Sequence, residues 1–293
     1  LQETLPPQLQ DETPLHILAW TTTPWTLPSN TALTVGSSID YVVVSTFNRY
    51  THLPIRVLLA KDLVPKVFTK VFQQVEANDD LLSYDKKGKN IPFLITDEVK
   101  GAALVGIRYK QLWSDAPLPH NTPEHAFRVI AGDFVTTDDG TGIVHTAPTF
   151  GADDAVVAKQ ATPEVPPMLV LDEHEQLVPL VDLQGRFRKE LGSLGGKYVK
   201  NEYYNDGQAP DKSVDVEIAI RLKEENKAFT VEKYVHSYPN CWRTDKPVLY
   251  YPLDSWFVKV SDKKERLVAL NNNINWKPKS TGEGRFGNWL ANA

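Results

Sequence analysis

The 293-residue chain is 41% hydrophobic and 24% charged, which is close to an ordinary globular protein and excludes wholesale disorder. Its net charge of −5 argues against a protein that grips a long nucleic acid through its phosphates, so any nucleic-acid contact should be short. A single cysteine, Cys241, excludes a disulfide framework and any zinc site with two thiolates, and it fits a reducing compartment such as the cytoplasm.

Strands are expected to dominate the first half of the chain. Residues 1–13 look like a loose lead-in, after which β-branched and aromatic residues alternate with turn signals. A helix is expected over about Lys61–Val75, and residues 138–140 (Asp-Asp-Gly) predict a tight hairpin between Phe134–Thr137 and the strand that follows. The predicted strands are His16–Thr21, Asp40–Phe47, Ile55–Ala60, Phe93–Thr96, Phe127–Ala131 and Gly142–His145.

One amphipathic helix is expected in the second half. Ser213 or Asp211 can cap its start, because a short polar side chain can accept a hydrogen bond from a free amide of the first turn. Val214, Ile218 and Leu222 then recur at intervals of four and share one face. This face should pack on the core.

The composition also suggests how the chain is organised. Pro163–Pro167 is a Pro-rich connection, and beyond Tyr238 aromatic residues and prolines prevail. We therefore expect a lead-in over 1–13, one domain over 14–237 and a connecting segment over 238–293. The expected fold class is α+β and β-rich. The apolar runs are too short to span a bilayer, and the N-terminus lacks the basic start and apolar stretch of a signal peptide.

The stretch Trp20–Asn30 gathers three consecutive threonines at the end of a predicted strand. Pro24 fixes its own φ and pushes Thr23 towards an extended conformation. Because Thr22 and Thr23 alternate faces, at least one hydroxyl should face inward, where it could hold an ester carbonyl or a water. The alternative is a Thr-rich edge strand entering a turn, since threonine is simply a good strand residue.

A second stretch of interest runs from His145 to Asp154. A strand ends at the histidine, a Pro/Gly loop follows, and a helix is expected from just after Phe150 to about Gln160. A strand-to-helix junction gathers side chains and free amides, so a carboxylate there could bind an ammonium group. The alternative is that Asp153 or Asp154 merely caps the helix beside a structural histidine.

Other chemistries find little support in the sequence. There is no Gly-x-Ser-x-Gly elbow, and residues 140–142 (Gly-Thr-Gly) lack the third glycine of a phosphate loop. A metal site is possible through His145 and Asp154 or through residues 173–175, but neither set has a specific ligand spacing. The remaining hydroxyls, imidazole and carboxylate suit the positioning of a water on a reactive substrate.

Together, the two stretches resemble the editing domain of isoleucyl-tRNA synthetases, which hydrolyses wrongly charged valyl-tRNA. Residues 21–30 (Thr-Thr-Thr-Pro-Trp-Thr-Leu-Pro-Ser-Asn) are similar to its threonine-rich strand, and residues 140–148 with Asp154 are similar to the second half of its pocket. Residues 236–243 and 285–290 look like the places where this insertion rejoins the synthetic core. Thr23 stands where valyl and leucyl relatives carry Arg, which favours the isoleucyl branch.

The resemblance implies a fold, partners and cofactors. The fold would be a distorted β-barrel with peripheral helices. The His-Ile-Gly-His and Lys-Met-Ser-Lys-Ser signatures of the synthetic core are absent from this sequence, so no amino-acid activation is expected. Editing would need no cofactor, whereas ATP and magnesium belong to the absent core. The expected partners are the 3′ end of tRNA(Ile) carrying valine and the remainder of the synthetase, for a cytoplasmic monomer without membrane contact.

The resemblance also implies a role for each position. Asp154 should hold the α-ammonium of the mischarged amino acid, kept ionised by its helix N-terminus and by the cationic substrate. His145 should lie near the amino-acid side chain and help to exclude isoleucine. The hydroxyls expected to contact the ester and the terminal ribose, and to order the water, are those of Thr21, Thr22 and Thr23. Trp25 and Asn30 are expected to shape the pocket, and Thr26 occupies a position that blocks the cognate amino acid in the leucyl relatives. The catalytic candidates are Thr22, Thr23, His145 and Asp154.

Two other functions stay open on the sequence alone. One is a binding module that recognises the aminoacyl-adenosine end without turning it over. The other is an unrelated metal hydrolase that uses His145 and Asp154. Three basic clusters, within 86–89, 186–189 and 259–266, are either solvated faces or docking patches.

Overall fold

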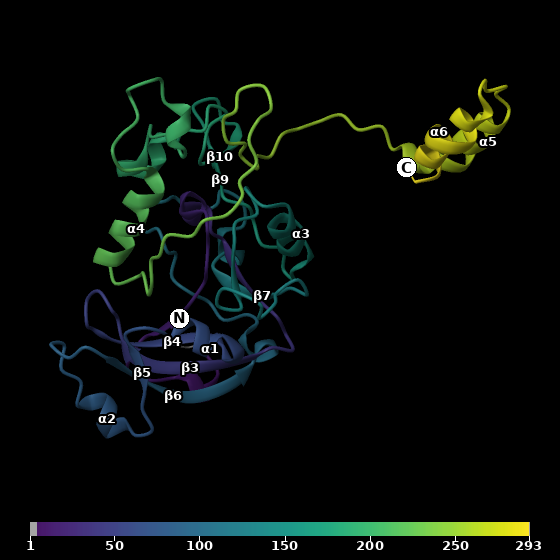
Figure 1. Cartoon of the computed structure of the whole chain (residues 1–293). Coiled ribbons are helices and arrows are strands. Elements are labelled where there is room, and N and C mark those ends of the chain that lie inside the picture. Colours follow the sequence, from purple (N-terminus) through teal and green to yellow (C-terminus); the bar gives the residue numbers. More distant parts are fainter. Residues whose placement is uncertain (1–4, 293) are drawn as a thin grey trace. The chain divides into compact units, whose positions relative to one another are not determined.

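The computed structural model describes residues 5–292, which divide into two compact units between Tyr251 and Pro252. Figure 1 shows that the larger unit carries the described strands, whereas the smaller one is helical. The predicted limits at 13/14 and 237/238 stay predictions, and residues 1–4 of the lead-in lie outside the described residues. The division falls after Tyr251 because this side chain packs with the larger unit. Its hydroxyl donates to the Val181 carbonyl at 2.9 Å, and its ring lies 6.1 Å from that of Phe150.

The larger unit is built around a five-stranded sheet with the order β1-β4-β3-β6-β5. Successive side chains of a strand point to opposite faces. On β3, Tyr41 and Val43 accordingly join one core cluster, while Val42 and Val44 join another. The centre of the sheet, at β3 and β4, is therefore buried on both faces. Its strands are β1 (Leu15–Ile17), β3 (Asp40–Phe47), β4 (Pro54–Ala60), β5 (Phe72–Gln74) and β6 (Ile91–Lys100).

A three-stranded sheet carries the segment that ends in His145. It has the order β7-β2-β8, with β2 (Ala32–Val35) parallel to β7 (Arg128–Ala131) and antiparallel to β8 (Ile143–Thr146). Leu33 lies opposite His145 in this register. The sheet thus brings the residues that follow Asn30 beside the second stretch of interest.

Hydrogen bonds fasten the two sheets to each other. The hydroxyl of Tyr41, a fully buried side chain of β3, donates to the Gly142 carbonyl at 2.7 Å and accepts from the Gly36 amide at 3.0 Å. The Ala60 amide at the end of β4 donates to the Thr141 carbonyl at 2.9 Å. The chain entering β8 is therefore anchored on the five-stranded sheet.

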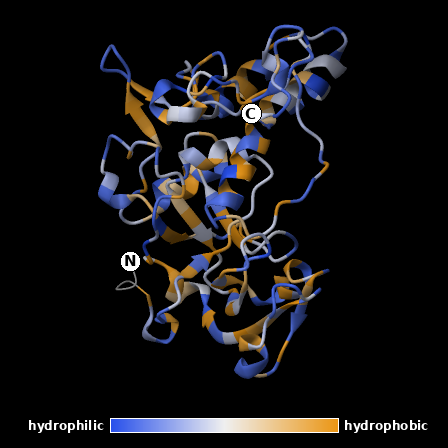
Figure 2. Cartoon of the chain, turned by 90° about the vertical axis from the view of Figure 1, so that its left-hand side faces the viewer, coloured by the Kyte–Doolittle hydropathy of each residue, from blue (hydrophilic) through white to orange (hydrophobic). Residues whose placement is uncertain are grey.

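The amphipathic helix is confirmed as α4 (Val214–Glu224), whose first turn is capped by Ser213 through a 3.4 Å bond from the Val216 amide. Figure 2 shows hydrophobic residues gathered on the strands and helices, and hydrophilic residues in the connecting loops. The remaining elements are β9 (Leu169–Leu171), β10 (Leu177–Pro179), α1 (Val64–Val67), α2 (Asn78–Leu82), α3 (Ala152–Gln160), α5 (Lys264–Asn272) and α6 (Phe286–Ala291). The predicted helix that ends at about Gln160 is confirmed by α3.

The long helix predicted over Lys61–Val75 is wrong. Helical structure ends at Val67, and Lys70 has a positive φ of 62° that interrupts a right-handed helix. The chain then forms β5, which pairs in parallel with β6. Phe72 stacks on Phe229 with ring centroids 5.3 Å apart. Aromatic packing and sheet pairing outweigh the local helical pattern here.

The predicted hairpin at residues 138–140 is also wrong. A turn does occur there, with Gly140 at a φ of 73°, but Phe134–Thr137 forms no strand. The antiparallel partner of β8 is β2, which lies about 110 residues earlier in the chain. At the N-terminal side, the predicted strand His16–Thr21 is shorter than expected, since β1 ends at Ile17 and Trp20 forms only an isolated bridge with Val144.

The fold class is a mixture of α and β structure, as predicted, but the expected distorted barrel needs a correction. Among the described residues the strands form three open sheets of five, three and two strands, with no closed barrel. β1 and β5 are the end strands of the five-stranded sheet, and β7 and β8 those of the three-stranded sheet, whose outer edges carry, among these residues, only isolated bridges to Arg108 and Trp20. No helix in residues 5–292 is long and apolar enough to cross a membrane.

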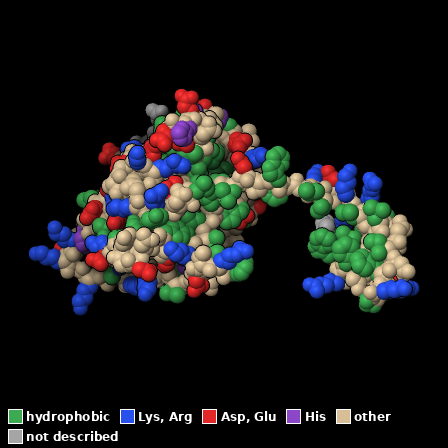
Figure 3. All heavy atoms as spheres, turned by 90° about the horizontal axis from the view of Figure 1, so that it is seen from above, with side chains coloured by type: hydrophobic (Ala, Val, Ile, Leu, Met, Phe, Trp, Pro, Cys, Tyr) green, Lys and Arg blue, Asp and Glu red, His purple; other side chains and the backbone are tan. Residues whose placement is uncertain are grey.

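The smaller unit exposes many apolar side chains. Figure 3 shows a hydrophobic patch on its visible face. At the start of this unit, Trp256, Phe257 and Val258 are almost fully exposed, and Trp289 on α6 is 64% exposed. Exposed apolar patches of this kind mark surfaces that another molecule or domain covers.

Candidate functional site

The threonine-rich stretch forms a short 3-10 helix, Pro24–Ser29, in place of an edge strand. Pro24 occupies the first turn, where a backbone N–H would have no partner within the helix, so the missing N–H of proline costs no hydrogen bond. The backbone of Thr23 lies outside the helical region, as expected for a residue before a proline. The Thr21 hydroxyl accepts from the Thr23 amide at 3.0 Å and lies 3.3 Å from the Thr23 hydroxyl. Two of the three predicted hydroxyls therefore converge.

A chain of side-chain hydrogen bonds connects this helix to β8. The His145 Nε2 lies 3.1 Å from the Thr26 hydroxyl, which donates to the Thr23 carbonyl at 2.9 Å. On the other side of the imidazole, Nδ1 lies 2.8 Å from the Asn30 amide nitrogen. The Tyr109 hydroxyl donates to Asn30 Oδ1 at 2.6 Å. Five residues from three separate parts of the sequence thus form one connected hydrogen-bonded relay.

The direction of this relay follows from the Asn30 amide. Its nitrogen has two hydrogens and lies 2.8 Å from the Ala32 carbonyl, an acceptor only, so the nitrogen rather than the oxygen faces this side; its other hydrogen reaches His145 Nδ1 at 2.8 Å, and the Thr146 carbonyl at 3.3 Å can share one of the two. The Nδ1 of His145 must then accept, and its Nε2–H donates to Thr26. Burial lowers the pKa of His145 to about 4, so the ring is neutral near pH 7. Both ring nitrogens are engaged, and the imidazole positions Thr26.

Asp154, the third residue of α3, closes the loop between β8 and this helix. Its Oδ2 accepts from the Ala147 amide at 2.8 Å. The N-cap of α3 is Gly151, and no side chain caps the helix. Burial raises the pKa of Asp154, which the Ala147 amide partly offsets. This direction is opposite to the one expected from the helix N-terminus alone, because desolvation of the charged form outweighs the favourable dipole.

Trp25 is held by a residue that no local pattern indicates. Its backbone amide donates to Asp215 of α4 at 2.9 Å, and the Lys200 ammonium lies 3.6 Å from the other carboxylate oxygen. The indole packs on Phe150, with ring centroids 5.1 Å apart. Tyr109 and Asp215 stand 79 and 190 residues from their partners, so only the tertiary fold brings them to the site.

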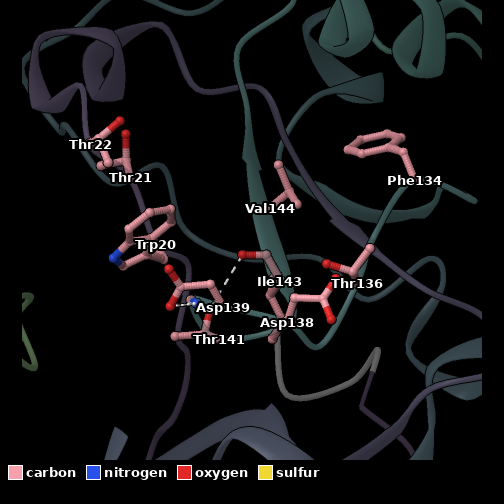
Figure 4. A pocket seen from close by; sticks show the side chains of 12 residues that line it. Trp20, Thr21, Thr22, Phe134, Thr136, Asp138, Asp139, Thr141, Ile143 and Val144 are labelled. Atoms are coloured by element: carbon pink, nitrogen blue, oxygen red, sulfur yellow. Dashed lines mark hydrogen bonds between the residues drawn. The ribbon is translucent and has the colours of Figure 1, made fainter. Parts of the chain in front are cut away.

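A cavity of about 400 Å³ opens beside the threonines. Trp20, Thr21 and Thr22 line one side, and Phe134 and Thr136 belong to the other, with Val144 between them in Figure 4. The Trp20 ring packs over Gly140, where an added Cβ would lie 3.3 Å from the indole. His145 and Asp154 are not among the residues that line this cavity.

Residues 21–293 match the family described as tRNA synthetases class I (I, L, M and V). The chain belongs to this family of class I tRNA synthetases. The isoleucine–tRNA ligase of Cytophaga hutchinsonii is 57% identical over 98% of the chain and 26% of that protein. The enzyme of the same name from Bacteroides fragilis is 51% identical over 94% of the chain and 25% of that protein. The predicted resemblance to isoleucyl enzymes is thereby confirmed.

The synthetase chain spans about a quarter of the length of these curated relatives. Among solved structures, the P.knowlesi cytosolic leucyl-tRNA synthetase editing domain gives a TM-score of 0.35 at 14% identity. That similarity covers 53% of this chain and 55% of the other. It is too weak to assign a function.

In this class I synthetase segment, the structure unites some of the predicted site residues and leaves others apart. Thr22 contributes to the cavity wall, while Trp25 and Asp154 are tied to Asp215 and Ala147. Residues 5–292 hold no group of three His, Cys, Asp or Glu side chains arranged to bind a metal. The members joined in one hydrogen-bonded set are Thr21, Thr23, Thr26, Asn30 and His145.

Proposed function

We propose that this segment hydrolyses the ester bond of valyl-tRNA(Ile), as the editing part of an isoleucine–tRNA ligase. The observation that carries the proposal is the relay from Tyr109 through His145 to the threonines, at the edge of a cavity that opens to solvent. Membership of the class I family supports the same substrate class. The partners would be the 3′ end of tRNA(Ile) and the remainder of the enzyme, in the cytoplasm, and the editing reaction would need no cofactor.

The protein needs to supply only positioning for this hydrolysis, because an aminoacyl ester is already reactive. A water adds to the ester carbonyl, the bond to the ribose oxygen breaks, that oxygen takes a proton, and valine leaves. The hydroxyls of Thr21, Thr22 and Thr23 would hold the ester and orient the water, and Asp154 would bind the ammonium group. Such positioning can supply much of the rate enhancement, since it converts an encounter into an oriented reaction.

Selection against isoleucine would rest on the rigidity of the pocket that receives the amino-acid side chain. Burying one extra methylene is worth only about 0.8 kcal/mol, so attraction for valine cannot give strong selectivity. Overlap with a packed wall costs about 1–3 kcal/mol, which corresponds to about 5-fold to 150-fold. His145 does not line the cavity, but its imidazole, bonded at both nitrogens, would hold Thr26 and the threonine stretch in place behind such a wall. A second sieve that admits only the smaller amino acid is the general solution to a one-methylene problem, and isoleucyl-tRNA synthetases are its standard example.

The test is deacylation of valyl-tRNA(Ile) and isoleucyl-tRNA(Ile) by the purified chain. We expect valine release to exceed isoleucine release by about 5-fold to 150-fold. We also expect full activity after exhaustive chelation, which a metal hydrolase would not retain. Release of valine at the uncatalysed rate would overturn the proposal, and tight binding of a non-hydrolysable valyl-adenosine analogue in that case would favour a binding module.

A further inference from the structure

A row of four aromatic rings leads away from the cavity. The Trp20 ring meets Tyr234 edge to face, with centroids 5.4 Å apart and planes at 87°. Tyr234 lies 5.8 Å from the His236 ring, which lies 6.2 Å from Tyr238. We call these four residues the aromatic row. Trp20 belongs to the cavity wall, so the row begins where the cavity opens.

Three of the four rings stand at alternate positions of one segment. Residues 230–238 form no helix or strand. The rings of residues 234, 236 and 238 follow one another along this segment, with successive centroids 5.8 and 6.2 Å apart. Because this segment has no sheet partner, the ladder of rings is not explained by sheet pairing.

Three of the four rings are open to solvent, and the fourth, that of Tyr238, is partly buried. Trp20 is 42% exposed, Tyr234 is 54% exposed, and His236 is also exposed. Large aromatic side chains gain most from burial, so a contiguous exposed set indicates a surface that a ligand covers. At the far end, the Lys200 ammonium lies 4.8 Å from the centre of the Tyr238 ring. This contact places a cation beside the last ring.

We propose that the aromatic row is a stacking platform for the unpaired nucleotides that precede the terminal adenosine of the tRNA. The proposal rests on the proposed function, in which Thr21 and Thr22 of the cavity wall would hold the ester that joins valine to that terminal nucleotide. Every nucleobase has an apolar face, so aromatic rings in series bind single-stranded RNA with little dependence on its sequence. Stacking also agrees with the acidic net charge, because it needs no array of phosphate-binding lysines.

The first experiment measures binding without any hydrolysis. A 5′-labelled RNA tetramer, ACCA, is titrated with the full chain and followed by fluorescence anisotropy. Tyr234→Ala should weaken binding by about 10-fold to 100-fold, as loss of one stacked base does, and Tyr234→Phe should retain it. The matched control is Tyr250→Ala, since Tyr250 is 61% exposed and lies outside the row. Equal affinities for Tyr234→Ala and Tyr250→Ala would overturn the proposal.

The second experiment separates the row from the ester site. A valyl ester of adenosine lacks the preceding nucleotides, whereas a valylated minihelix carries them. The His236 ring contacts those of Tyr234 and Tyr238 and not the cavity wall, so His236→Ala should lower kcat/KM for the minihelix by about 10-fold to 100-fold and leave turnover of the valyl-adenosine ester unchanged. An equal loss on both substrates would contradict a platform role. If the unaltered chain hydrolyses neither ester, the proposed function fails, while the anisotropy result still decides on the row.

Discussion

Replacement of Tyr109 by phenylalanine tests the relay at its buried end. The change removes the hydroxyl that donates to Asn30 Oδ1 at 2.6 Å and leaves the ring in place, so no cavity forms. Asn30 is only 5% exposed, and its oxygen would be left without this donor. An unsatisfied buried acceptor costs about 1–3 kcal/mol of unfolding free energy. Urea denaturation followed by circular dichroism at pH 8 should show a loss of this size.

A second prediction concerns the unfolding free energy of the same variant at alkaline pH. Burial raises the pKa of Tyr109 well above its usual value, so the folded state keeps a proton that the unfolded phenol has lost above about pH 10. The folded state then binds more protons, and the unfolding free energy of the unaltered chain falls by up to about 1.4 kcal/mol per pH unit. Phenylalanine has no such proton, so the difference between the two chains should vanish about one to two units above pH 10.

The control for both measurements is Tyr250→Phe, because the side chain of Tyr250 is 61% exposed. It should change the unfolding free energy by less than about 0.5 kcal/mol at either pH. A loss below that value for Tyr109→Phe at pH 8 would refute the hydrogen-bonded relay. A loss that is the same at pH 8 and pH 11 would refute the assignment of a buried, protonated phenol.

Three further substitutions probe the site and the fold. Asp154→Asn keeps an acceptor for the Ala147 amide. Burial raises the pKa of Asp154, so the stability that its protonated form contributes is lost as the pH rises through that pKa. At pH 7 the variant, which cannot ionise, should therefore be at least as stable to unfolding as the unaltered chain. Its kcat/KM for valyl-tRNA deacylation should nevertheless fall about 10-fold to 100-fold with the loss of a charged hydrogen bond, and undiminished activity would remove the carboxylate role. Gly151→Ala would place a Cβ 2.8 Å from the Asp154 carboxyl carbon and should cost about 1–3 kcal/mol by thermal denaturation, whereas Gly284→Ala, with no atom within 4 Å, should cost less. Ser213→Ala removes the cap of α4 and should cost about 1 kcal/mol in urea denaturation, and an unchanged midpoint would contradict that cap.

Local patterns predict the elements whose causes are themselves local. The apolar residues of β3 and the Ser213 cap of α4 act over a few residues, so the sequence is sufficient for both. β2 escapes prediction because its four residues, Ala32–Val35, become a strand only through pairing with β7 and β8. Phe72 falls within a predicted helix because the stacking partner that draws it into β5, Phe229, is far along the chain.

For the candidate site, too, the sequence predicts what local residue patterns determine and misses what distant residues contribute. The two stretches that contain Thr23 and His145 are recognisable from their residues, and the fold does connect them. The residues that orient them, Tyr109 and Asp215, have no local signature, since one hydroxyl and one carboxylate occur at many positions in any sequence. Only the tertiary structure shows which atom donates in each hydrogen bond of Asn30, because the Ala32 and Thr146 backbone carbonyls orient its side-chain amide.

Tyr41 couples the strand that carries His145 to the five-stranded sheet. Its hydroxyl joins β3 to the Gly142 carbonyl at the entry to β8, and the neighbouring Ala60 amide bonds to Thr141. A local opening of β8 must therefore break contacts with the five-stranded sheet as well as with β2. Amide hydrogens of β3, β4 and β8 should then exchange with solvent together, as one cooperative unit. The hydrogen-bonded relay would therefore be anchored to the buried strands β3 and β4 of the five-stranded sheet.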